Sequence, residues 1–292
     1  MKLWLKFSAI FVVVFCIGLV IAGYICHDFL LDNARTTVTQ RADLISESML
    51  AARQYTAQQV GPLLDSLTAK DKNFHPQTIP FYAATESFQY VRHAFPQYSY
   101  KEAALNPTNM RDRAMDWESD VIRTFRDDKS KKELVFERDT PMGRRMVLAR
   151  PIAVEASCLQ CHSTPSAAPA SLVRSYGTVN GFGWREGEIV GAQVISVPME
   201  VPIHMADVAF RSLMTSLIVL GILTLAVLNL GMFLMVVRPV SQLAKRADEM
   251  SRGKLNSPEL PSAGSDEISV LARAFNRMQR SMAQAMKMLE QQ

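Results

Sequence analysis

The 292-residue chain offers little support for several common functions. Its 32 lysines and arginines are nearly balanced by 28 aspartates and glutamates, so the formal net charge is only +4. Such a mild charge gives no reason to expect a nucleic-acid partner. Cysteine is scarce, with four residues, and only two of them are closely spaced. The function therefore has to be sought in short motifs and in the distribution of apolar residues.

The two closely spaced cysteines lie in the run Cys158-Leu159-Gln160-Cys161-His162. Two cysteines separated by two residues and followed at once by a histidine are typical of c-type haem attachment. Two thioethers form to the porphyrin edge, and the adjacent imidazole reaches the iron. We predict one covalent haem c, anchored by Cys158 and Cys161, with His162 as the proximal ligand of the metal.

Two other interpretations of this spacing need to be weighed. A redox-active disulfide is expected in a thioredoxin-like βαβ setting, whereas this motif is followed by residues 163–169, a segment rich in proline, alanine and serine. A zinc site needs two further ligands at matching spacing, and the sequence contains no second such cluster. The motif therefore favours covalent haem over both.

Charge is missing from two long apolar stretches, residues 7–25 and the run between Arg211 and Arg238. Each is close to the roughly 20 residues that cross a bilayer as a helix. Lys2 and Lys6 precede the first stretch, as in a signal peptide. Its uncharged core is longer than the roughly 7 to 15 residues of a signal sequence, and no clear cleavage site follows it. We interpret it as an uncleaved anchor.

Positive residues flank both stretches on the side away from the haem motif: Lys2 and Lys6 before the first, and Arg238, Lys245 and Arg246 after the second. This bias predicts a multi-pass protein of the bacterial inner membrane with both termini in the cytoplasm and the haem motif in the periplasm. Haem is attached on that outer face, so the two predictions agree. The expected order is a cytoplasmic N-terminus, a transmembrane helix, a periplasmic haem domain, a second transmembrane helix and a cytoplasmic module, at residues 1–6, 7–26, 27–210, 212–237 and 238–290.

Apolar residues recur about every 3.6 positions between residues 28 and 67, which predicts a long amphipathic helix, kinked or broken at Gly61-Pro62. Residues 76–107 contain four prolines and are expected to be rich in loops. One helix and three strands should follow, at residues 116–125, 133–138, 145–152 and 188–198. A helix followed by a meander of strands predicts an α+β, PAS-like domain flanked by two transmembrane helices.

Five short runs of this outer region resemble the Tll0287-like family: Ala51–Thr56, Tyr100–Asn109, Asp139–Arg144, Cys161–Pro165 and Gly181–Trp184. The resemblance covers most of residues 32–203. It implies a PAS-like fold that holds one covalent c-type haem, often placed outside the membrane ahead of signalling modules. It does not identify a sensed ligand.

The sixth ligand of the iron decides much of the function, because a gas sensor needs this position open or displaceable. The resemblance suggests a ligand from the first outer helix, where one type of member uses a cysteine, but the body of this helix contains none. Met49 lies on the inward stripe of this helix, and a thioether ligand would raise the haem potential. We predict Met49 as the second metal ligand. The alternative that Met49 only packs in the core stays open.

Other side chains remain weaker candidates for the sixth position: His93, His75, His204, Cys26, Met142 and Met146. Arg53, Arg144 and Arg150 are candidates for pairing with haem propionates, although salt bridges at the surface explain them equally well.

After the second apolar stretch, Pro239 opens a short helix over residues 237–250, and a connector rich in glycine, serine and proline covers residues 253–264. Asp266-Glu267 then opens a second helix whose apolar residues step by three and four: Ile268, Leu271, Phe275, Met278, Met282, Ala285 and Leu289. This arrangement resembles a HAMP domain over residues 237–290, an all-α parallel coiled-coil module, which implies a homodimer. Taken alone, the heptads would also fit a plain dimerisation coil.

These features favour a membrane receptor that senses redox state or a small gas and relays the change through the HAMP module. The sequence has no kinase, cyclase or methyl-accepting region. Either a separate cytoplasmic signalling protein acts in trans, or the chain is part of a longer receptor. The alternative is a membrane-anchored c-type cytochrome for electron transfer. We expect no enzyme and no catalytic residues, because no acid–base pair accompanies the motif.

Overall fold

The computed structural model describes residues 3–64, 74–254 and 257–289. Contacts divide the chain into two compact units. Residues 27–208 form the outer unit, and residues 1–26 together with residues 209–292 form the second unit. Two long helices, α1 (Leu3–Tyr55) and α7 (Glu200–Met232), contribute residues to both units.

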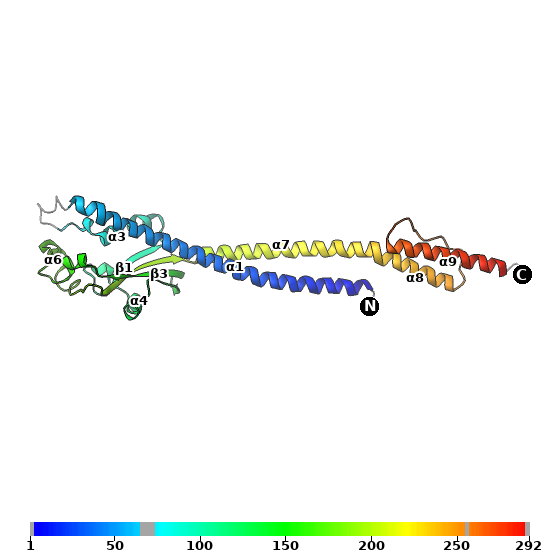
Figure 1. Cartoon of the computed structure of the whole chain (residues 1–292), viewed down its shortest axis with the longest axis horizontal. Coiled ribbons are helices and arrows are strands. Elements are labelled where there is room, and N and C mark those ends of the chain that lie inside the picture. Colours follow the sequence, from blue (N-terminus) through cyan, green and yellow to red (C-terminus); the bar gives the residue numbers. More distant parts are fainter. Residues whose placement is uncertain (1–2, 65–73, 255–256, 290–292) are drawn as a thin grey trace. The chain divides into compact units, whose positions relative to one another are not determined.

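The outer unit is built on one antiparallel sheet of four strands in the order β1-β4-β3-β2. Strands β1 and β3 of this sheet are labelled in Figure 1. The strands are β1 (Ser99–Ala104), β2 (Leu134–Thr140), β3 (Gly143–Ala153) and β4 (Ile189–Pro198). The three predicted strands are confirmed. Strand β1 was missed because it lies within the proline-containing stretch that was expected to form loops.

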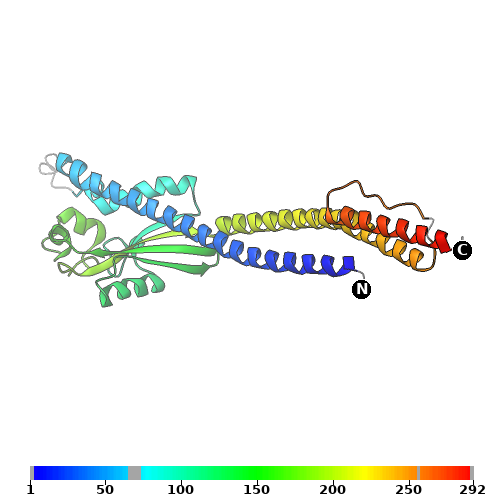
Figure 2. The same ribbon diagram turned by 45° about the vertical axis from the view of Figure 1, so that its right-hand side comes forward.

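Helices cover both faces of this sheet (Figure 2). On one face α1 and α3 (Pro80–Ala94) enclose a core with β1, β3 and β4, whose buried members include Val38, Phe88, Leu148 and Ile195. On the other face α4 (Asp116–Asp127), which was predicted as residues 116–125, packs through Ile122 and Phe125. Burial from both sides explains why β4 is a nearly continuous apolar run.

Helix α3 corrects the expectation that residues 76–107 are mostly loop. Pro80 occupies the start of the helix, where a missing backbone N–H leaves no helical hydrogen bond unmade. Phe88 then points into the core with an exposed fraction of only 1 %. The prolines at 76 and 96 lie outside α3, so the loop signal was correct only for the flanks of the helix.

The predicted outer helix is confirmed as the continuation of α1, and Gly61-Pro62 does not break it. A π-helical turn covers Thr56–Val60 instead, with the N–H of Gly61 donating to the carbonyl of Thr56. Pro62 has no N–H, and its ring would clash with the carbonyl four residues earlier, so the chain accommodates it with a wider turn. The predicted end of this helix at Leu67 lies outside the described residues.

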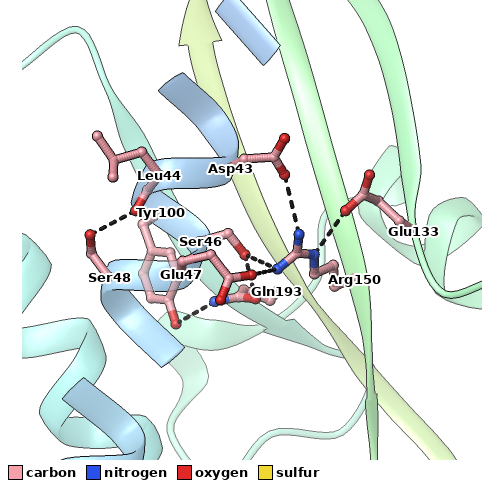
Figure 3. A network of polar contacts seen from close by, with 9 residues as sticks. All are labelled: Asp43, Leu44, Ser46, Glu47, Ser48, Tyr100, Glu133, Arg150 and Gln193. Carbon is pink, nitrogen blue, oxygen red and sulfur yellow. Dashed lines mark hydrogen bonds and ion pairs between the residues drawn. The ribbon is translucent and has the colours of Figure 1, made fainter. Parts of the chain in front are cut away.

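Arg150 on β3 connects α1 to the sheet (Figure 3). Its guanidinium donates to Asp43 at 3.2 Å, to Glu47 at 2.5 Å and to the hydroxyl of Ser46 at 3.0 Å, all on α1. It also donates to Glu133 at 2.9 Å. Because one cation meets three carboxylates from two segments, this contact holds α1 in one position along the strands.

A chain of buried polar groups continues inward from Ser46. The Ser46 hydroxyl donates to the side-chain oxygen of Gln193 at 3.2 Å, and the Gln193 amide donates to the Tyr100 hydroxyl at 3.4 Å (Figure 3). Tyr100 donates in turn to Glu102 at 2.5 Å. Burial raises the pKa of Glu102 to about 8, although the Tyr100 hydrogen bond opposes the shift. Glu102 is therefore a buried acid that holds its proton near neutral pH.

In the second unit, the apolar parts of α1 and α7 are long and apolar enough to cross a membrane. The phenyl ring of Phe15 lies against Gly221, where any side chain would clash with it. Ser8 donates to the side chain of Asn229. These contacts join the two apolar helices as a packed pair, with a glycine at the close approach.

The C-terminal helices of the second unit are α8 (Arg238–Ser251) and α9 (Glu267–Leu289), as the sequence predicted. A π-helical turn, Phe233–Val237, precedes Arg238-Pro239 and repeats the arrangement found before Pro62. The connector is held by Asn276, whose side chain accepts from the N–H of Leu260 at 3.0 Å and donates to its carbonyl at 2.9 Å. Leu260 is thereby fixed between the helices, in a small core with Leu243 and Ala272.

Candidate haem site

The Cys-x-x-Cys-His motif lies in the long connection between β3 and β4. This connection is closed at its base, where the Val154 N–H donates to Glu188 and the Gly187 N–H donates to Val154, both at 2.9 Å. Within it, η4 (Ala156–Cys158) leads directly into the short helix α5 (Leu159–His162), and α6 (Ala170–Tyr176) follows. Cys158, Cys161 and His162 therefore fall on about one helical turn, and all three are half-buried.

The side chain of His162 has a defined tautomer in this setting. Its Nδ1 lies 2.7 Å from the carbonyl oxygen of Gly181. A carbonyl can only accept, so Nδ1 must hold the proton, and Nε2 of the neutral ring is left with a free lone pair. Burial lowers the pKa of His162 and so favours this neutral ring, although the Gly181 bond opposes the shift. The histidine is thus prepared to bind a metal through Nε2.

Trp184 fixes the plane of the His162 ring. The two rings are stacked, with centroids 4.0 Å apart and an angle of 12° between planes. The backbone N–H of Trp184 donates to the carbonyl of His162 at 3.2 Å, and the N–H of Gly183 donates to the carbonyl of Ser163 at 3.0 Å. Residues 181–184 therefore hold the histidine by its ring and by its backbone. Sequence reasoning assigned these residues no role beyond their part in the resemblance.

The two cysteines of the motif carry free thiols. Burial raises the pKa of Cys161, and the nearby Cys158 raises it further. The attacking thiol of a redox-active Cys-x-x-Cys pair is the first cysteine, so the raised pKa of Cys161 gives no support to the disulfide interpretation and does not argue against it. Within the described residues, no group of three or more histidine, cysteine, aspartate or glutamate side chains is placed to hold a metal ion. The zinc interpretation gains no support either.

These residues fit a c-type haem. Two thiols and an imidazole with an available Nε2 share one turn, and the imidazole is oriented by a hydrogen bond to its other nitrogen, as is usual for metal-binding histidines. The fit rests on this donor set and on the orientation of the ring.

The predicted sixth ligand, Met49, lies on α1 with an exposed fraction of 6 %. It belongs to the core between α1, α3 and the sheet, a cluster that also contains Met146 but none of Cys158, Cys161 and His162. The structure thus brings the three motif residues together and leaves Met49 among core residues. Its role as a ligand stays a prediction.

The other candidate ligands lie in varied settings. Met142 is 70 % exposed at the turn between β2 and β3. His93 and His204 are exposed, whereas His75 and Cys26 are half-buried.

The three candidate propionate partners also differ. Arg144 pairs with Asp139 at 3.1 Å, and Arg150 is committed to the carboxylates around α1. Arg53 stacks on the ring of Phe81, with its guanidinium carbon 3.6 Å from the ring centroid. Salt bridges thus account for Arg144 and Arg150, and pairing of Arg53 with a propionate stays a prediction.

Fold and site together define a protein with an α+β domain, two apolar helices and a C-terminal helix pair. A HAMP domain model matches residues 232–284, which identifies a signal-transduction protein of the kind found in membrane receptors. The Tll0287-like family model matches residues 31–198, more than half of the chain, and the chain belongs to this family.

The chain is also similar to one solved structure, described as the cyanobacterial heme-protein Tll0287. The two share 16 % sequence identity with a TM-score of 0.43, and the match covers 55 % of this chain and 94 % of that one. No curated protein matched the chain.

Proposed function

We propose that the chain is a membrane receptor that senses redox state or a small gas through one covalent c-type haem. Cys158 and Cys161 form the thioethers, and His162 binds the iron. The observation that carries this proposal is the arrangement of His162, whose Nδ1 is bonded to Gly181 one turn from the two free thiols. When bound, the haem supplies an iron that changes oxidation state or takes up a diatomic ligand.

The residues of the chain have separate tasks in this proposal. His162 presents Nε2, Trp184 keeps the ring plane fixed, and Met49 on α1 is the proposed sixth ligand. A change at that ligand would act on the same helix that Arg150 ties to the sheet. Because α1 and α7 both continue into the second unit, either helix offers a route from the haem domain to the HAMP module.

The proposed topology follows the distribution of positive charge. Residues 7–26 and 212–237 cross the bacterial inner membrane, residues 27–210 form a PAS-like periplasmic domain, and residues 1–6 and 238–290 lie in the cytoplasm. The HAMP module makes the receptor a homodimer, and a cytoplasmic signalling protein acting in trans is the proposed output partner.

The first experiment tests the haem. The full chain should be produced in a bacterial host able to attach haem c and then stained for haem after denaturing electrophoresis. We expect a stained band that Cys158→Ala or Cys161→Ala greatly weakens, whereas His162→Ala retains the stain but changes the absorption spectrum. Cys16→Ala is a matched control, since Cys16 lies in the first apolar stretch. Unchanged staining in both motif variants would overturn the proposal.

The second experiment tests whether the iron takes up an external gas. Absorption spectra of the oxidised and reduced protein should be recorded with and without nitric oxide and carbon monoxide. Gas binding would favour a gas receptor. A six-coordinate iron indifferent to both gases would leave redox sensing or electron transfer. Loss of the absorption features of methionine-ligated iron in Met49→Ala would then identify Met49 as the sixth ligand. Met142→Ala, at an exposed position, is the control.

A further inference from the structure

The carbonyl that meets His162 belongs to a residue that can only be glycine. Gly181 has φ +83°, a backbone conformation that side chains rarely adopt. A Cβ atom there would clash with Oγ1 of Thr108 and lie 2.8 Å from its Cα. The path of the chain at Gly181, and therefore the direction of its carbonyl, depends on close approach to the segment that follows β1.

The Asn106 side chain binds the backbone on both sides of the Gly181 carbonyl. Its Oδ1 accepts from the N–H of Gly181 at 3.2 Å, and its Nδ2 donates to the carbonyl of Phe182 at 3.4 Å. The residue before it, Leu105, donates its N–H to Val190 on β4 at 3.1 Å. Asn106 is thereby anchored to the sheet, and its two hydrogen bonds fix the backbone around the Gly181 carbonyl, which contacts Nδ1 of His162.

We propose that Asn106 is a positioning residue for His162, acting through the Gly181 carbonyl on the electronic character of the imidazole. The proposal rests on His162 being the haem ligand. A well-aligned bond from Nδ1 to a carbonyl makes the other nitrogen a better donor, which favours the ferric iron and lowers the reduction potential. Outer partners of metal-binding histidines commonly change metal affinity or activity by about 10-fold or more.

The direct test is the reduction potential of the full chain carrying covalent haem, measured by spectroelectrochemistry. In Asn106→Ala the Gly181 carbonyl is no longer held, so we expect the haem to stay attached while the potential rises. The expected change is about 10-fold in the ratio of reduced to oxidised protein, which for one electron corresponds to about 59 mV. Asn106→Asp keeps the acceptor for the Gly181 N–H and adds a negative charge, so its potential should stay at or below that of the original protein.

Asn109 provides a matched control three residues further on. Its side chain accepts from the N–H of Arg111 at 3.1 Å within its own turn. Asn109→Ala should leave the potential unchanged. If Asn106→Ala does not accumulate, Asn106→Ser replaces it, because a serine hydroxyl keeps the position polar but is too short to make both bonds. A rise is again expected.

The two proposals fail in different ways. Absence of covalent haem from the original protein would overturn the proposed function. If Asn106→Ala carries covalent haem with the same reduction potential as the original protein, only the role of Asn106 is overturned. The same holds for Asn106→Ser where that variant replaces it. A purely structural role would alter yield or melting temperature without moving the potential.

Discussion

The outer unit and the C-terminal helix pair differ in how completely each buries its apolar side chains. In the outer unit, Phe88, Phe125 and Leu148 are at most 1 % exposed, because helices cover both faces of the sheet. On α9, Leu271, Met278 and Met282 remain 53 %, 47 % and 49 % exposed. A coiled-coil seam left open in one chain is completed by another copy. The difference shows that the outer unit encloses its own core, and the exposed seam of α9 supports the proposal that the helix pair is part of a homodimer.

The largest expected effect tests the self-contained core of the outer unit. Phe125→Ala removes a fully buried ring from the cluster between α4 and the sheet. The lost burial and the remaining cavity should lower the free energy of unfolding by about 3–5 kcal/mol. Chemical denaturation followed by fluorescence measures it. Tyr90→Ala, at a position 79 % exposed, should cost far less, and equal losses would contradict the comparison.

A smaller effect is expected at the connector of the helix pair. Asn276→Ala removes both hydrogen bonds to the backbone of Leu260 and leaves two buried polar groups without these partners. The free energy of unfolding should fall by about 2 kcal/mol, and proteases should cleave the connector faster. Arg277→Ala, at the neighbouring exposed position, is the control. Equal cleavage rates in the two variants would show that Asn276 does not hold the connector.

A substitution in the exposed seam of α9 should weaken the proposed dimer. Leu271→Glu places a charge on the half-exposed seam, so the dimer should dissociate about 10-fold more readily, which corresponds to about 1.4 kcal/mol. Cross-linking of the full chain in membranes measures it. Gln284→Glu, at an exposed position of the same helix away from the seam, is the control for added charge. Unchanged dimer yield in Leu271→Glu would argue that the seam faces no second copy.

The last prediction concerns the pH dependence of stability that comes from the acid inside the outer unit. The pKa of Glu102 is about 8 in the folded protein, against an ordinary value of 4.5. The folded state therefore holds a proton that the unfolded state releases as the pH rises above 4.5, and its stability should fall up to about pH 8. The slope of the unfolding free energy is at most about 1.4 kcal/mol per pH unit, the limit set by one proton. Melting temperatures between pH 5 and 8, compared with those of Glu102→Gln, measure it. An equal slope in that variant would show that Glu102 is not the source of the pH dependence.

Much of this architecture could be predicted because its signals are local. The strands β2, β3 and β4 and the helices α4, α8 and α9 were all expected from periodicity and turn residues. Helix α3 was missed because Pro80 was taken as a loop signal, whereas at the start of a helix it is well tolerated. Strand β1 was missed because it lies between Pro96 and Pro107, in the stretch that was expected to form loops.

By itself, the sequence determined the features that depend on neighbouring residues: the Cys-x-x-Cys-His spacing, two uncharged stretches and the seam of α9. Only the tertiary structure decided which groups surround them. Gly181 reaches His162 from 19 residues away, and Arg150 reaches Ser46 from 104 residues away. Such partners leave no periodic pattern, because a single hydrogen bond between distant segments depends on the packing of the whole sheet and its helices.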